Sequence, residues 1–177
     1  MREFNVTGLC VPSEHYMVDI SGKISEILKL VHKKRYFTIN RARQYGKTTT
    51  LNQLKKAISQ DSEYICISIS FESMDPHDFD SPSVFCKMFL NKISRALKSS
   101  NAEISYAERW HNPDVTDFKK LDEHITEMCE NKKLVLMIDE VDKSTNNRLF
   151  LHFLGMLRAK FLSRQAEKDH NTLKYYL

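Results

Sequence analysis

The segment from Arg41 to Thr48 constrains the fold of this 177-residue chain more than any other, because it joins a candidate strand to a candidate helix through a short loop containing glycine and lysine. The apolar run before it, residues 36–40, predicts a strand. After it, apolar side chains recur at helical spacing at Leu51, Leu54 and Ile58. Strand, loop and helix in this order predict an α/β fold in which the helix N-terminus faces the loop.

The loop has the chemistry of a phosphate-binding site. The N–H groups at a helix N-terminus are unpaired and lie at the positive end of the helix dipole, so they bind anions. Gly46 lets the backbone approach a phosphate, Lys47 supplies a mobile positive charge, and the Thr48 hydroxyl suits Mg²⁺. The predicted nucleotide-binding residues are Arg41, Ala42, Arg43, Gln44, Tyr45, Gly46, Lys47, Thr48 and Thr49.

A second segment supports this interpretation. Residues 134–138 form a continuous apolar run, which is typical of a parallel strand buried on both faces, and Asp139 and Glu140 follow it. Ligands of open α/β sheets bind at the carboxyl ends of such strands, so both acids are expected beside the loop. Asp139 is then a candidate metal ligand together with Thr48. Glu140, with Lys47, is a candidate catalytic residue that orients or deprotonates the attacking water.

These segments resemble the AAA-ATPase-like family of P-loop proteins, which is similar to the archaeal-type ATPases and often linked to a nuclease-like domain of the PD-(D/E)XK type. The resemblance extends over residues 4–10, 15–20, 36–51, 136–143 and 150–158. Arg41 occupies the position of the first glycine in the general pattern G-x-x-x-x-G-K-[ST]. The family's R-x-R-x-x-G-K-[ST] loop fits Arg41 and Arg43. The resemblance implies that Lys47 and Thr48 bind phosphate and Mg²⁺, Asp139 the metal, and Glu140 the hydrolytic water.

The implied fold is a three-layer P-loop NTPase-like α/β domain, with a mainly parallel sheet and helices on both faces. In related ATPases another strand follows the acidic strand and carries a residue that senses the γ-phosphate. Here only a short β-prone run, residues 173–177, follows the last predicted helix, so the domain is interpreted as C-terminally incomplete or truncated. We expect this run to take the place of the missing strand, and a frayed terminus is the alternative.

Composition agrees with one domain over residues 1–177, with an N-terminal segment and helix over 1–34 and a nucleotide-binding core over 35–177. The chain is 41% hydrophobic and 28% charged, which is ordinary for a globular protein. No apolar run reaches the roughly twenty residues of a membrane span, and no signal-peptide core is present, so a cytoplasmic location is expected. Free, mostly buried thiols are predicted for the widely spaced Cys10, Cys66, Cys86 and Cys129.

Periodicity predicts the remaining elements. Helices are expected over residues 21–32, 81–97 and 146–161, and another is expected after an N-cap at Thr116. Residues 64–70 alternate as a strand at or near the sheet edge. Residues 74–78 and 99–114 are expected to be loops. Trp110, in the longer loop, is more often a plug at the edge of a core than a base-stacking residue.

The predicted function is binding of Mg-ATP, with slow hydrolysis by an AAA-like ATPase. No arginine finger is identified, since Arg158 and Arg164 are better interpreted as surface residues, and a homo-oligomer or a partner would have to supply one. Two alternatives stay open: a non-hydrolysing nucleotide-binding or interaction module, and a nucleic-acid-associated protein of a mobile element or defence system. The net charge of +4 permits nucleic-acid contact without indicating it.

Overall fold

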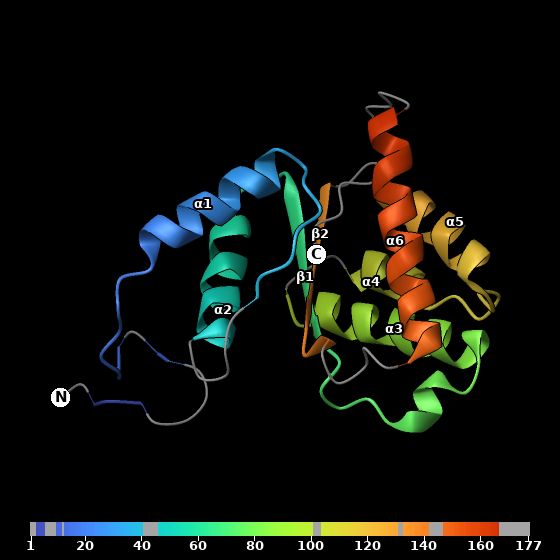
Figure 1. Cartoon of the computed structure of the whole chain (residues 1–177), viewed down its shortest axis with the longest axis horizontal. Helices are drawn as coiled ribbons and strands as arrows, with labels where there is room; N and C mark the ends of the chain where they lie inside the picture. Colours follow the sequence, from blue (N-terminus) through green and yellow to red (C-terminus); the bar gives the residue numbers. More distant parts are fainter. Residues whose placement is uncertain are drawn as a thin grey trace.

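The computed structural model describes residues 3–5, 10–11, 13–40, 46–100, 104–130, 133–141 and 147–166, and the side chains of this set through Ser163. Its helices lie on both sides of a short sheet (Figure 1). Along the chain the elements are α1 (Ser21–His32), α2 (Lys47–Ile58), β1 (Tyr64–Ser70), the 3₁₀ helix η1 (Pro76–Phe79), α3 (Pro82–Lys98), α4 (Ile104–Arg109), α5 (Phe118–Cys129), β2 (Lys133–Asp139) and α6 (Arg148–Ala166).

The sheet of the described residues consists of β1 and β2, which pair in parallel. Tyr64 lies opposite Lys133 and Ser70 opposite Asp139, so both strands end at the same edge. The β2 side chains Leu134, Val135 and Leu136 are at most 1% exposed. Burial of successive residues means that both faces of β2 are covered, as the continuous apolar run predicted.

Each face of the sheet has its own hydrophobic core. Ile67 and Leu136 point to a large core built with α3, α4, α5 and α6. Cys66 and Val135 point to a smaller core built with α1 and α2. The alternation follows from the two-residue period of a strand, which sends neighbouring side chains to opposite faces.

Most helix predictions hold, with shifts at their ends. The helix α1 covers the predicted residues 21–32, and Ser81 caps α3 by accepting the backbone N–H of Val84. The predicted cap at Thr116 is wrong, because Asp117 accepts the N–H of Lys120 and its charge also suits a helix N-terminus. The last helix begins two residues later than predicted and continues to Ala166.

Four other expectations need correction. Residues 35–40 form no strand, because their backbone pairs with no strand of the described residues. The expected 99–114 loop contains α4, and the expected 74–78 loop overlaps η1, which begins at Pro76 and is capped by Asp75. Val84 belongs to the apolar stripe of the helix expected over residues 81–97 and was therefore expected to be buried, but it is 42% exposed. Trp110 is fully buried, which confirms the core interpretation and leaves no exposed ring for base stacking.

The described cysteines are all free thiols, and Cys66, Cys86 and Cys129 are buried. Within the described part of the chain, no helix combines the length and apolar character needed to cross a bilayer.

Candidate nucleotide site

Three charged side chains join the start of α2 to the end of β2. The Nζ of Lys47, the first residue of α2, lies 2.9 Å from Oδ1 of Asp139 and 3.2 Å from Oε1 of Glu140. The three side chains are 29%, 15% and 28% exposed, so the cluster is half-buried but open to a ligand. The structure therefore brings together the three residues that the sequence predicted would meet.

Two residues with positive φ, Gly46 and Glu140, orient these side chains. Gly46, with φ of 70°, is the N-cap of α2 and turns the chain so that Lys47 opens the helix. Glu140 has φ of 57°, a left-handed conformation that costs a non-glycine residue about 1–3 kcal/mol. Its N–H donates to Oδ1 of Asp139 at 2.8 Å. The turn after β2 thus directs two successive carboxylates to one lysine, and strained backbone positions of this kind cluster at active sites and ligand-binding sites.

The two carboxylates stabilise the charged form of Lys47. The bond to Asp139 is the main cause that raises the pKa of the Lys47 ammonium, and Glu140 acts in the same direction. Partial burial opposes both effects. A phosphate that approaches the N-terminus of α2 would therefore meet a fully protonated lysine at neutral pH.

The oxygen donors at this end of the sheet fit a magnesium site. Mg²⁺ is usually held by one or two carboxylates together with substrate phosphates, and it keeps several waters. Asp139 supplies a half-buried carboxylate, and Thr48 lies exposed in the first turn of α2. The described residues include no group of three or more His, Cys, Asp or Glu side chains with metal-binding spacing. This donor set suits a cation that arrives with a polyphosphate better than one held by protein alone.

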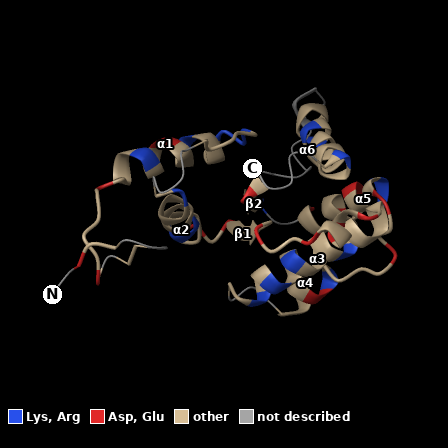
Figure 2. Ribbon diagram, turned by 60° about the horizontal axis from the view of Figure 1, so that its bottom comes forward, with Lys and Arg blue, Asp and Glu red and all other residues tan. Residues whose placement is uncertain are grey.

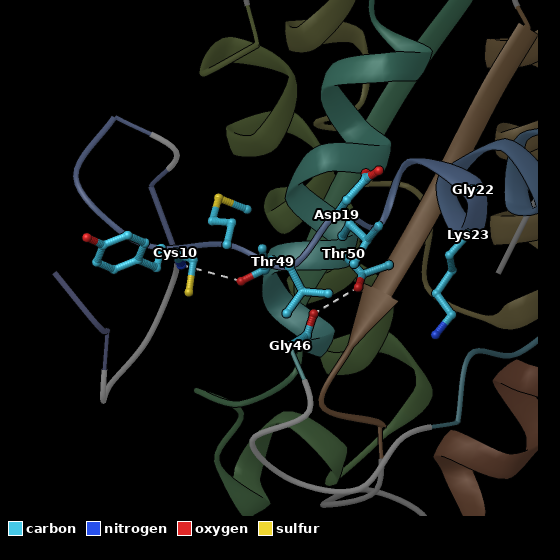
Figure 3. Close-up of a pocket in the computed structure, with 11 residues that line it drawn as sticks. Cys10, Asp19, Gly22, Lys23, Gly46, Thr49 and Thr50 are labelled. Carbon is cyan, nitrogen blue, oxygen red and sulfur yellow. Dashed lines mark hydrogen bonds between the residues drawn. The ribbon is translucent and has the colours of Figure 1, made fainter. Parts of the chain in front are cut away.

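A cavity of about 590 Å³ lies next to this cluster, between the N-terminus of α2 and the segment that leads into α1 (Figure 3). Its volume is typical of small-molecule sites. Tyr16, Met17 and Ile20 contribute apolar surface, while Asp19 and Lys23 contribute charge. Its lining residues are Cys10, Tyr16, Met17, Val18, Asp19, Ile20, Gly22, Lys23, Gly46, Thr49 and Thr50.

One of the two threonines of the cavity links its walls. Figure 3 shows their hydroxyls bonded in different directions. The Thr50 hydroxyl donates to the carbonyl oxygen of Gly46 at 2.9 Å, whereas the Thr49 hydroxyl accepts the backbone N–H of Cys10 at 3.3 Å. Thr49, predicted to bind nucleotide, thus tethers the N-terminal segment to α2 and also lines the cavity. Sequence reasoning missed the wall from Tyr16 to Lys23, because only long-range packing brings it to α2.

Several predicted residues lie outside the described part of the chain. These are the loop residues 41–45, residues 142–143 of the family-like segment 136–143, and the β-prone run 173–177. Arg158 is exposed, as predicted, and the side chain of Arg164 is not among those described.

Comparison with known proteins gives one family. The family model described as "AAA-like domain" matches residues 12–176, which is nearly the whole chain. The comparison with curated proteins and the comparison with solved structures each gave no match.

Proposed function

Because the chain belongs to the AAA-like domain family, we propose that it binds Mg-ATP at the Lys47 cluster and hydrolyses it slowly. The observation that carries the proposal is the contact of Lys47, at a helix N-terminus, with Asp139 and Glu140 at the end of a buried parallel strand. Anion-binding groups, a metal ligand and a candidate base then lie within one site. A three-layer P-loop architecture would be the scaffold.

Each residue has a proposed role. The ammonium of Lys47 would leave its carboxylate partners and bind the β- and γ-phosphates. Asp139 and the Thr48 hydroxyl would hold Mg²⁺, which supplies charge neutralisation at the transferred phosphate. Glu140 would orient the attacking water and accept its proton. Gly46, with no Cβ, leaves room for the phosphates to reach the N–H groups of α2.

The nucleoside would occupy the cavity shown in Figure 3. This cavity includes Gly46 in its lining and therefore adjoins the phosphate end of the site. Tyr16 and Ile20 offer apolar surface for a base, and Thr50 lines the opposite wall. This placement lets one ligand contact both the apolar cavity and the charged cluster.

Calorimetry with Mg-ATP and with a non-hydrolysable analogue tests binding, and phosphate release tests turnover. Lys47→Ala should weaken affinity about ten- to a hundredfold, since a hydrogen bond to a charged group contributes about 1.5–3 kcal/mol. Lys56→Ala is the matched control, because Lys56 is an exposed lysine in the last turn of the same helix. Equal loss of affinity in both variants would contradict the assignment.

Glu140→Gln separates chemistry from binding. It should leave the affinity for Mg-ATP nearly unchanged and slow phosphate release about 10²- to 10⁴-fold. If wild type binds Mg-ATP but releases no phosphate, the non-hydrolysing module becomes the correct function. The Glu140 carboxylate is bonded to Lys47, so nucleotide binding must rearrange this contact before Glu140 can act on a water.

A second cavity is lined by Lys47, Asp139 and Glu140. Slow turnover is proposed because no arginine among the described residues lines this cavity or the one at Gly46. An arginine from a second copy or a partner typically raises the rate about 10³- to 10⁵-fold. Phosphate release per protein molecule should then rise with protein concentration. A rate that is fast and independent of concentration would place the finger within the chain.

A nucleic-acid role has less support. Lys and Arg are distributed over several helices, among them α1, α2, α3, α5 and α6, instead of concentrated on one element (Figure 2). Nucleic-acid-binding domains usually gather these charges in a patch or stripe. DNA binding measured across a salt series would reveal such a role as a steep loss of affinity with salt.

A further inference from the structure

Basic side chains gather where α1 and α2 end, at the end of the sheet opposite the candidate nucleotide site. Tyr64, the first residue of β1, lies next to the ends of both helices, whereas Lys47 meets Asp139, the last residue of β2. Figure 2 shows Lys and Arg along the turn that leaves α1. We call this group the basic cluster, and its members are Lys29, Lys33, Lys34, Arg35 and Lys56.

The charges of the basic cluster are available to a partner. Lys29, Lys33, Arg35 and Lys56 are exposed, and Lys34 is half-buried. Among the described residues, no ion pair includes any member of the cluster. An anionic partner would therefore meet cations that do not first have to leave a carboxylate of the described part of the chain.

The turn after α1 holds the cluster in a defined position. The N–H of Arg35 donates to the carbonyl of Leu30 at 3.1 Å, and the N–H of Lys34 donates to that of Val31 at 2.9 Å. These two bonds form a Schellman motif, whose positive-φ position is usually glycine. Lys34 takes this position with φ of 55°. A charged side chain thus occupies a backbone conformation that favours glycine.

A small pocket lies beside the basic cluster, between the ends of α1 and α2. Its volume is about 230 Å³, below the roughly 300–1,000 Å³ of small-molecule sites, and suits one large side chain. The last turns of the two helices supply its apolar surface. Its lining residues are Leu28, Val31, His32, Ala57, Ile58, Gln60, Asp61 and Tyr64.

From this arrangement we propose that the end of the molecule formed by α1 and α2 binds an acidic segment of a partner protein. One large apolar side chain of that segment enters the pocket, and its carboxylates lie against the basic cluster. Protein interfaces commonly combine an apolar anchor in a central pocket with a polar rim. Opposite charges on the rim speed association and select the partner. Because the pocket and the Lys47 cluster lie at opposite ends of α2, the proposal does not depend on nucleotide binding.

The pocket suits a peptide side chain better than a nucleobase. Bases of single strands stack on open aromatic faces. The Tyr64 ring already carries the ammonium of Lys133 at 5.5 Å from its centroid, and the His32 ring meets it at 70° with centroids 5.8 Å apart. The nearby acidic groups are engaged within the protein, since Asp61 accepts the N–H of Glu63 at 2.9 Å and Glu63 pairs with Lys133.

Fluorescence anisotropy with short labelled peptides and the full chain tests the proposal. The probe carries one Phe between Glu residues, and two matched peptides replace Phe by Ala or every Glu by Gln. The probe should bind at least about tenfold more tightly than either matched peptide, and more weakly as salt rises. Equal affinities, or no saturable binding below about 1 mM, would overturn the proposal. Tighter binding of a single-stranded oligonucleotide at the same salt would assign the surface to nucleic acid and contradict it.

Variants of the basic cluster separate binding from stability. Lys34→Gly removes a charge and introduces the residue that the turn favours. The affinity for the probe should fall at least about threefold while the melting temperature rises by a few degrees. Arg35→Glu should weaken binding at least about tenfold. Lys87→Glu, the same reversal at an exposed lysine of α3, is the control. Equal losses in the two reversals, or unchanged affinity in Lys34→Gly, would reject the basic cluster as the binding surface.

Two further measurements locate the anchor. Ala57→Leu fills the pocket and should abolish the preference for the probe over its Ala counterpart, and a retained preference would place the anchor elsewhere. If this variant does not fold, hydrogen exchange of the wild-type chain gives the location. The bound probe should slow exchange in residues 28–35 and 55–61 and not in α3. Protection at Gly46 instead would put the peptide in the candidate nucleotide cavity and overturn the proposal.

Discussion

The two faces of the β1–β2 sheet differ in how they are packed. The face covered by α3, α4, α5 and α6 holds fully buried rings, among them Phe85, Phe153 and Trp110. The face covered by α1 and α2 is closed by aliphatic residues such as Ile24, Leu54 and Ile58, and none of its described aromatic rings is fully buried. The candidate nucleotide site belongs to α2, on this second face, which we call the lighter face because its buried side chains are smaller.

This difference separates stability from function. Large rings in mutual contact contribute much buried area and specific geometry, so the aromatic face should hold most of the folding free energy. The α1–α2 face carries Lys47 and the cavity at Gly46, and both must adjust when a ligand enters. Elements that adjust to ligands are usually drawn from the less stable parts of a structure. We therefore expect α1 and α2 to open locally while the aromatic core stays intact.

The largest expected effect is on the aromatic face. Phe153 is fully buried, and its ring centroid lies 4.8 to 6.4 Å from those of five other rings, Phe71, Phe85, Phe89, Phe118 and Phe150. Phe153→Ala should lower the free energy of unfolding by about 3–5 kcal/mol in urea titrations. Leu151→Ala, on the same helix but 50% exposed, should change it by less than about 1 kcal/mol. Similar losses of unfolding free energy in both variants would show that the buried rings do not make the aromatic face the more stable one.

The loss of folding stability at high pH tests how well the lighter face excludes water. Burial raises the pKa of the Cys66 thiol from 9.0 to about 12. Because the folded pKa exceeds the unfolded one, this contribution to stability is complete below about pH 9 and is lost as pH rises towards 12. At pH 10.5 the loss should be about 2 kcal/mol. Cys66→Ala should reduce the measured fall in stability between pH 8 and 10.5 by that amount.

A backbone change at the site should have a smaller effect. No described atom lies within 4 Å of a Cβ added to Gly46, but its φ is 70°. Gly46→Ala should therefore cost about 1 kcal/mol through backbone strain alone. Gly22→Ala is the control, since Gly22 has the same open surroundings and lies in the first turn of α1 without a positive φ. The melting temperatures of both variants show whether the positive φ at Gly46 disfavours a residue with a Cβ.

The smallest effect on stability is expected in the core that α1 and α2 form against the sheet. Ile27 is 8% exposed and packs in the α1–α2 core. Ile27→Val removes one methylene group and should cost about 0.5–1 kcal/mol. Hydrogen exchange should show the added opening in α1 and not in α3. If the loss were spread evenly over both helices, the two faces would unfold as one unit and the comparison would fail.

Much of this fold follows from local sequence. The period of 3.6 residues predicts α1 and α3, and the uninterrupted apolar run predicts β2, because these patterns depend only on which side chains must leave water. The helix start at Lys47 follows in the same way from Gly46. The N-cap of α5 does not follow from local sequence, since Thr116 and Asp117 both suit the role and only the backbone conformation selects one.

The sequence by itself determined which residues could form the site, whereas tertiary structure decided how they meet. Lys47 and Glu140 are 93 positions apart, and only the packing of α2 against the sheet brings their side chains within 3.2 Å. The same holds for the cavity wall from Tyr16 to Lys23 and for the burial of Trp110. Residues 36–40 look like a strand in sequence but lack a described partner, because a strand needs hydrogen bonds from a neighbour that its own sequence does not specify.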